Sequence, residues 1–310
     1  MVVDLTNCRG FLGKLEVGDG LPVRVMGVIN VSPESFFKGS IAFKAEELPK
    51  RVEALVDEGA DLIDIGGMST APYLNTMITV EEELERVTRA VRIIKDITDI
   101  PISVDTFRSK VADAALKLGA EVINDVTGLR GDPKMVDVLL NYRPSLVVCP
   151  KINSVKLNSD PVNLVIETLR ETLDIITSRG LNPSKVIVDP CIGFHRFKEI
   201  PWYIWDLTLI SKLDRLKVLS RPILIGVSRK SFIGAVLGKE RPEERLYSSL
   251  AYTAIAVLKG AHVIRTHDVA ASKDVIKAVE SFKHYNLTLV VDYPFVENNS
   301  NSRRDGPSKA

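Results

Sequence analysis

Hydrophobic and polar positions follow one repeating pattern along most of this chain. A short apolar run ends in polar residues or glycine, and a charged amphipathic segment follows it. The apolar runs show little alternation, which is typical of strands buried on both faces of a parallel sheet. They predict eight strands, at Val23–Asn30, Leu62–Gly67, Ile102–Thr106, Val122–Gly128, Ser145–Pro150, Val186–Pro190, Ile223–Ser228 and Val263–Val269.

The segments between these runs have the period of helices. KAEELPKRVEALVDEGA and VEEELERVTRAVRIIKDI carry apolar stripes at a spacing of about 3.6 residues, and the second is rich in i,i+4 charge pairs. Eight strand–helix units are the number in a (β/α)₈ TIM barrel, so the pattern predicts an α/β chain with a single barrel domain. A doubly wound open sheet is the alternative architecture.

Two segments lie outside the pattern. Residues 1–22 contain Gly18-Asp19-Gly20 between apolar flanks, which predicts a hairpin-like extension covering the bottom of the barrel. The tail ENNSNSRRDGPSKA has almost nothing to bury, so we expect residues 286–310 to be mostly disordered. The barrel itself is expected over residues 23–285.

Composition excludes several classes of protein. The net charge of +1 gives no general attraction to nucleic acid or to an anionic membrane. No apolar run is long enough to span a bilayer, and the N-terminus does not have the layout of a signal peptide. Cys8, Cys149 and Cys191 lack metal-like spacing, so we expect reduced thiols in a cytoplasmic protein with neither nucleic-acid nor membrane partners.

The expected strand ends are unusually polar. In a barrel the carboxyl ends of all strands meet at one face, so side chains placed there converge. One such group would be a satisfied core residue, but many together favour a site over a structural hydrogen-bond network. The polar strand ends are Asn30, Asp64, Asp105, Asn124, Asp189, Ser228 with Lys230, and Arg265 with His267.

These groups sort by chemistry into two sets. Asp105, Asn124, Asp189 and Lys230 offer carboxylates, an amide and an ammonium, which suit a flat heterocycle rich in N–H groups and ring nitrogens. Arg265 and His267 are two residues apart on one strand and should point the same way, where with Asn30 and Gly66-Gly67 they could bind phosphate.

The segment IGVSRKSFIG adds a basic turn to this face. An apolar strand ends at Ser228, which we expect to cap the next helix and to leave Arg229 and Lys230 in its first turn. Cations are disfavoured at the positive end of a helix dipole, so two of them suggest an anion or a polar ligand. A solvated basic turn is the alternative.

Seven stretches together carry a family resemblance. VMGVINVSPESF, ADLIDIGGMSTAP, ISVDT, AEVINDVTG, VDPCIGF, IGVSRKSFIG and IRTHDV occur in this order, one at each of seven strand ends. Across about residues 23–285 the chain resembles dihydropteroate synthase, a (β/α)₈ barrel family. The resemblance implies a transferase that joins a dihydropterin methyl diphosphate to p-aminobenzoate and releases diphosphate in folate biosynthesis. It also implies Mg²⁺ and a homodimer.

The resemblance assigns roles to matching positions. Asp105 and Lys230 take catalytic roles within a pterin pocket completed by Asn124 and Asp189. The diphosphate region matches Arg265 and His267, with Asn30 toward the metal. The surroundings of the aminobenzoate match Thr70, Pro72, Ser228 and Arg229, and Phe194 lies near both substrates.

The chain departs from the family in its loops. NVSPESFFKGS stands where NVTPDSFSDGG is usual, and GGMSTAPY stands for GGESTRPG, so Met68 and Ala71 replace a Glu and an Arg. GFHR stands for GFGK, so His195 and Arg196 could supply the missing positive charge, or could belong to a solvated loop. The exchange of Glu and Arg for Met68 and Ala71 could instead open room for a larger acceptor, a ribosylated aminobenzene phosphate.

Two other functions remain open at this stage. A pterin-dependent methyltransferase would share the barrel and the pterin carboxylates but would not need the SRK and RTHD segments. A pterin-binding protein without catalysis would fit the altered loops.

Overall fold

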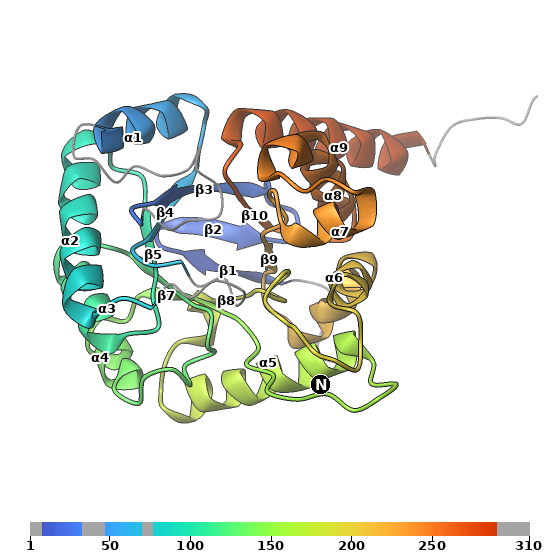
Figure 1. The fold of residues 1–310 in the computed structure, drawn as a ribbon. Coiled ribbons are helices and arrows are strands. Elements are labelled where there is room, and N and C mark those ends of the chain that lie inside the picture. The colour runs from blue at the N-terminus through green and yellow to red at the C-terminus, as the bar shows by residue number, and fades with distance from the viewer. Residues whose placement is uncertain (1–7, 33–46, 70–76, 290–310) are drawn as a thin grey trace, which may run out of the picture.

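Eight parallel strands form a ring with helices around its outside (Figure 1). The computed structural model describes residues 8–32, 47–69 and 77–289. The strands follow the order β8-β7-β6-β5-β4-β3-β10-β9, and a parallel bridge between Val188 and Ile223 joins the two ends of this series. The prediction of a (β/α)₈ barrel is therefore confirmed, and the open doubly wound sheet is excluded.

Each predicted strand has a counterpart in the barrel. Most end earlier than expected, because the polar residues after the apolar run already belong to the loops at the barrel mouth. The barrel strands are β3 Arg24–Asn30, β4 Leu62–Gly66, β5 Ile102–Asp105, β6 Val122–Asp125, β7 Ser145–Val148, β8 Val186–Val188, β9 Leu224–Ile225 and β10 Val263–Thr266.

The helices bury their apolar stripes against the outside of the ring. Helix α2 coincides with the second predicted amphipathic segment, and Thr79 with Glu82 forms a capping box at its start. The helices are α1 Glu47–Asp57, α2 Val80–Ile97, α3 Ser109–Lys117, α4 Met135–Tyr142, α5 Pro161–Ser178, α6 Trp202–Ser211, α7 Ser231–Leu237, α8 Leu246–Leu258 and α9 Val269–Leu289. Short 3₁₀ segments lie at Pro183–Lys185, Leu213–Leu219 and Pro242–Arg245.

An antiparallel hairpin precedes the barrel and closes its amino end. It consists of β1 Arg9–Leu12 and β2 Leu15–Gly18. The turn lies at Gly13-Lys14, where Gly13 has a φ of 61°, so the expectation of a turn at Gly18-Asp19-Gly20 is wrong. Gly18 instead pairs with Arg9 at the open end of the hairpin. A two-residue turn needs a left-handed residue, and Gly13 supplies it.

The hairpin contributes to the packing inside the ring. Leu12 and Val17 are fully buried in a cluster with one side chain from each of seven barrel strands. These are Met26, Leu62, Val122, Val147, Ile187, Leu224 and Val263. Ser145 on β7 accepts a hydrogen bond from the Gly13 N–H at 3.0 Å, which fixes the turn against the barrel.

At the other end of the chain, helix α9 continues to Leu289, past the expected boundary at residue 285. Residues 290–310, most of the expected tail, lie outside the described residues, and the division of the chain into three segments remains a prediction. None of the helices within the described ranges combines the length and the apolar composition that crossing a bilayer requires.

Candidate active site

The carboxyl ends of the strands enclose a small polar pocket. Six of the side chains selected from the sequence line it together, although they come from five different strands or strand ends and the loops that follow. They are Asp105, Asn124, Asp189, Phe194, Lys230 and Arg265. The pocket therefore combines carboxylates, an amide, two cations and one aromatic ring.

Asp64 on β4 lies beneath these groups and connects them. Its carboxylate accepts hydrogen bonds from Ser103 Oγ at 2.6 Å, from Asn124 Nδ2 at 3.3 Å and from the Arg265 guanidinium at 2.7 Å. Asp64 is fully buried. Its polar position in LIDIG is visible in the sequence, but its role, which is to hold Arg265 and Asn124 in place, is not.

Asp105 presents an unused acceptor to the pocket. Its Oδ2 accepts from Arg265 at 3.2 Å, whereas its buried Oδ1 has no hydrogen-bond partner among the described residues. Burial, with the nearby Asp64 charge, raises the pKa of Asp105 to about 7 although Arg265 opposes the rise. Burying an acceptor without a partner is costly, so Oδ1 is suited to a ligand that donates an N–H group.

Asp189 and Lys230 line the same pocket, and their charges act on each other. Burial raises the pKa of Asp189 to about 6, and its Oδ1 accepts from the Cys191 N–H at 2.7 Å. Burial also lowers the pKa of Lys230 to about 8, and its Nζ lies 4.4 Å from the centre of the Phe194 ring. A cation over an aromatic face, beside a carboxylate, can bind the polar edge and the face of a flat ring.

Arg265 carries the permanent positive charge of this pocket. Burial disfavours its charge, but Asp64 and Asp105 more than offset that effect and raise its pKa. His267 differs, because burial and the neighbouring charges of Arg265 and Lys230 lower its pKa well below the ordinary value. His267 is therefore neutral at neutral pH, and in the expected phosphate site it would offer hydrogen bonds rather than charge.

Ser228 does not cap the following helix as expected. Helix α7 begins at Ser231, and Lys230 occupies the position before it. The Ser228 hydroxyl is instead 3.0 Å from His267 Nδ1 and accepts from the His267 N–H at 3.3 Å. Arg229 precedes the helix as well, and its φ of 53° turns it away from the helical direction.

Arg229 joins the loop after β9 to Asp268 and to the segment Pro242–Arg245 through hydrogen bonds. Its guanidinium donates to both carboxylate oxygens of Asp268, at 2.9 and 2.7 Å, and to the Pro242 and Glu243 carbonyls. A paired, two-pronged arginine of this kind fixes the loop geometry. Its expected role in binding the acceptor stays a prediction, as does that of Ser228.

The remaining expected site residues lie at or beyond the edge of the described pocket. Asn30 ends β3, and its Oδ1 lies 3.1 Å from the place where a Cβ on Gly66 would be, so a side chain at position 66 would crowd this amide. An amide oxygen there suits a hard cation such as Mg²⁺, which commonly takes few protein ligands together with phosphates and waters. Thr70 and Pro72 lie outside the described residues, as does Ala71.

His195 cannot provide the extra positive charge that the sequence suggested. It is buried, and burial lowers its pKa to about 4, so it is neutral at neutral pH. Its Nε2 is 3.3 Å from the Pro150 carbonyl, and its ring packs 5.3 Å from Trp205. The Cζ of Arg196 lies 3.9 Å from the centre of the Trp202 ring, and its guanidinium donates a hydrogen bond to Ser231 Oγ at 2.9 Å.

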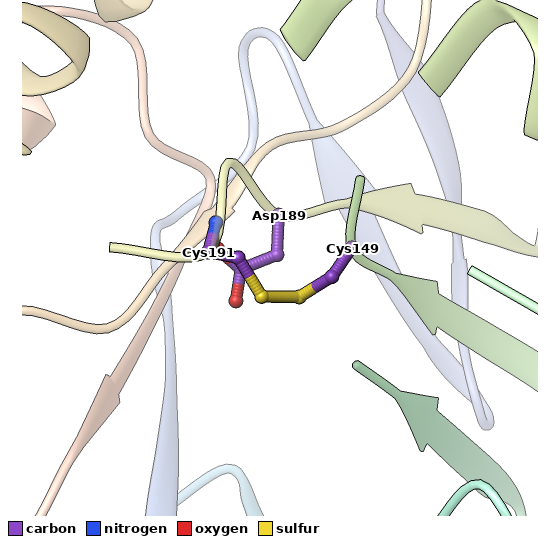
Figure 2. A group of neighbouring side chains, drawn as sticks. All are labelled: Cys149, Asp189 and Cys191. Carbon is purple, nitrogen blue, oxygen red and sulfur yellow. Dashed lines mark hydrogen bonds between the residues drawn. A yellow bond between two sulfur atoms is a disulfide. The ribbon is translucent and has the colours of Figure 1, made fainter. Parts of the chain in front are cut away.

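Cys149 and Cys191 form a disulfide, so the expectation of three reduced thiols is wrong for this pair (Figure 2). Their sequence separation of 42 residues hid the pairing, which becomes possible because β7 and β8 are neighbours and bring the two Cα atoms to 5.6 Å. Cys8 is free and buried. Asp189 lies beside the bridge, but sulfurs joined in a disulfide are not thiolate ligands, and the neighbouring Lys230 and Arg265 disfavour a metal cation there.

Comparison with known proteins agrees with this geometry. A family model described as "Pterin binding enzyme" matches residues 26–267. The dihydropteroate synthase of Clostridium beijerinckii is 35% identical over 273 residues, which cover 87% of this chain and 97% of that protein.

Solved structures agree as well. The Xanthomonas albilineans dihydropteroate synthase with 4-aminobenzoic acid has a TM-score of 0.79 and 34% identity, and the match covers 90% of this chain and 99% of that one. The same organism's enzyme in complex with 7,8-dihydropteroate has a TM-score of 0.75 and 33% identity, with 89% and 98% covered. The chain therefore belongs to the pterin-binding enzymes and, within them, to the dihydropteroate synthase family.

Proposed function

We propose that this protein joins 6-hydroxymethyl-dihydropterin diphosphate to p-aminobenzoate and releases diphosphate, as a dihydropteroate synthase of folate biosynthesis. One observation carries the proposal. In a chain of this family, the pocket holds a buried carboxylate oxygen, Oδ1 of Asp105, that has no partner among the described residues. The N–H groups on the edge of a pterin are suitable donors for it.

The pocket can bind the pterin through complementary edges. Asp105 and Asp189 accept N–H groups, while Asn124 and Lys230 donate to ring nitrogens and to the carbonyl oxygen. The Phe194 ring lies beside Lys230 and can cover one face of the heterocycle. The pocket is buried and charged, so it favours a ligand that satisfies each of these groups at once.

The same groups fit the chemistry of the transfer. When the bond from the pterin methylene to the diphosphate oxygen breaks, positive charge spreads over the pterin, and the Asp105 carboxylate stabilises it. The arylamine nitrogen then attacks the methylene carbon and loses a proton. Arg265 lies beside Asp105 and contributes positive potential where the diphosphate departs. The reaction needs no nucleophile from the protein.

Asn30 is the proposed protein ligand for Mg²⁺, which would neutralise the charge of the diphosphate when bound.

The proposed location is the cytoplasm. The argument from reduced cysteines no longer supports that location, and cell fractionation tests it.

A homodimer is the proposed assembly. Tyr247, Ile255 and Leu258 lie within one face of α8 and are exposed, with Leu237 of α7 exposed nearby in sequence. Such apolar residues are suited to packing against a second copy of the chain. Light scattering of the purified protein, with Tyr247→Asp as the variant expected to dissociate it, tests this assembly.

A diphosphate-release assay tests the proposed reaction. The full chain is incubated with the pterin diphosphate and p-aminobenzoate, and separately with the ribosylated aminobenzene phosphate. Release that depends on p-aminobenzoate is expected. Methyl transfer from a methyl-tetrahydropterin to a cobalamin, without diphosphate release, would identify the methyltransferase instead. Pterin binding without either reaction would identify the non-catalytic binding protein.

A further inference from the structure

Helix α6 contains one acidic residue in an otherwise apolar or uncharged segment, WYIWDLTLIS. That residue, Asp206, is fully buried. A carboxylate in the core is unfavourable unless it is hydrogen-bonded or close to a positive charge. Asp206 therefore needs a reason to be there, and the family roles assigned above do not provide one.

The partner of Asp206 is a turn of the active site. Its Oδ1 accepts a hydrogen bond from the Gly193 N–H at 2.9 Å. Gly193 has a φ of 84°, and a Cβ added to it would lie 3.1 Å from Cδ of Lys230. The stem of Lys230 thus packs against the backbone that Asp206 holds, and the next residue, Phe194, lies under the Lys230 ammonium.

The second oxygen of Asp206 adds an electrostatic effect. Oδ2 is buried and has no hydrogen-bond partner among the described residues, and burial raises the pKa of this carboxyl to about 6. The charged groups that act on Asp206 are Arg196 and Lys230. At neutral pH and above, its negative charge acts on the Lys230 ammonium.

Lys230 is under opposing influences from the surrounding elements. Burial and Arg265 on β10 lower its pKa, while Asp189 after β8, Asp206 on α6 and Asp105 on β5 raise it, in that order. Asp189 and Asp105 are expected to bind the pterin. Of these three carboxylates, Asp206 is the one that does not line the pocket.

We propose that Asp206 is a positioning residue for the transfer, which orients Lys230 and Phe194 through Gly193 and favours the charged form of Lys230. This inference rests on the proposed function. Asp206 contacts neither substrate in this scheme, so its effect on the reaction passes through Lys230.

The test separates charge from geometry with two variants. Asp206→Asn keeps an acceptor oxygen for the Gly193 N–H but removes the negative charge, so the pKa of Lys230 should fall. The alkaline limb of the kcat/KM profile should then move to lower pH by about one unit. Gly193→Ala keeps the charge but displaces Lys230, so it should weaken pterin binding and leave the alkaline limb in place.

Asp214→Asn is the matched control, because Asp214 is an exposed carboxylate just beyond α6. An alkaline limb in Asp206→Asn that coincides with wild type and with this control would overturn the inference. Affinity for a bare pterin analogue, measured by calorimetry against pH, should show the same shift without any turnover. A wild-type chain that binds pterin but releases no diphosphate would disprove the proposed reaction, while calorimetry would still decide the role of Asp206.

Discussion

The two ends of the barrel interior are built on opposite principles. At the amino end, Leu12 and Val17 of the hairpin pack with one apolar side chain from each of seven barrel strands, and all nine residues are fully buried. At the carboxyl end, Asp64, Asp105, Asp189, Lys230 and Arg265 gather within one small region. The first end has no charged member, and the second holds five.

The amino end of the barrel therefore contributes mainly to folding stability, and the carboxyl end mainly to ligand binding. Apolar burial at the amino end favours folding directly, at about 25 cal/mol per Å² removed from water. The carboxyl end has charges that burial disfavours and an oxygen, Oδ1 of Asp105, without a partner. The polar groups of such a pocket lack hydrogen-bond partners until a ligand binds. Substitutions there should therefore alter ligand binding far more than folding stability.

The largest effect is expected for Asp105→Asn. Removing one charged partner of a buried network costs about 2–5 kcal/mol in binding, and the cation of the reaction loses its stabilising carboxylate as well. Diphosphate release should fall below detection, and calorimetry should show much weaker binding of a pterin analogue. Unchanged pterin affinity would mean that the pocket is placed wrongly.

The folding stability of the same variant sharpens the contrast. The pKa of Asp105 is raised in the folded protein, so its contribution to stability is lost as pH rises from the unfolded pKa through about 7. Asn carries no charge, and the empty variant at alkaline pH should therefore be no less stable than wild type. Asp137→Asn, an exposed carboxylate on α4, is the control for both measurements.

The disulfide should contribute the next largest effect. A bridge between residues 42 apart restricts the unfolded chain, which corresponds to about 4 kcal/mol in the chain-entropy model. Cys149→Ser combined with Cys191→Ser should lower the free energy of unfolding by that order in urea titration. A dithiol reductant should lower the stability of wild type to that of the double variant and leave the variant unchanged. Equal stability of oxidised and reduced wild type would contradict this prediction.

The amino end can be tested with Leu12→Ala. Truncating this fully buried side chain should cost about 3 kcal/mol of stability, because it leaves a cavity in the apolar layer. The Kd for a pterin analogue should not change at a temperature where the variant is folded. Phe11→Ala is the matched control, since the neighbouring side chain is 41% exposed and its loss should cost far less. A changed pterin affinity in Leu12→Ala would show that the two ends are coupled.

The sequence predicted the ring because the buried strands are short, mainly apolar runs that show little alternation. It also predicted most of the pocket, since Asp105, Asn124 and Asp189 stand at strand ends where the geometry of a barrel forces convergence. The sequence did not predict how the side chains are oriented at this carboxyl face of the barrel. Ser228 looked like a helix cap, but the chain turns at Arg229, and the hydroxyl lies 3.0 Å from His267 Nδ1.

Contacts between residues far apart in the chain were the second feature that the sequence did not predict. Cys149 and Cys191 carry no spacing signal, and their pairing depends on the adjacency of β7 and β8. Asp206 is a single acidic residue in a helical segment without any motif around it, and only the fold identifies Gly193 as its partner. His195 looked like a cation because sequence gives no measure of burial, which keeps it neutral.

The smallest effect is expected for Arg196→Ala, in the loop after β8. Arg196 stacks on Trp202 and donates to Ser231 at the start of α7, so it ties the loop after β8 to the segment that carries Lys230. One charge-assisted hydrogen bond is worth about 1.5–3 kcal/mol, and kcat/KM should fall by roughly tenfold or more. Lys198→Ala, at an exposed position in the same loop, should leave kcat/KM near wild type.

The substrate dependence of Arg196→Ala tells how the residue acts. If its charge acts on the diphosphate, the variant should bind the pterin diphosphate more weakly and bind a bare pterin as wild type does. Equal losses for both ligands would assign Arg196 to loop positioning, as its contacts with Trp202 and Ser231 favour. In that case the carboxyl end would rely on Arg265 as its permanent cation among the described pocket residues, and the charge missing at Ala71 would not be replaced from this loop. No change with either ligand would remove Arg196 from the site.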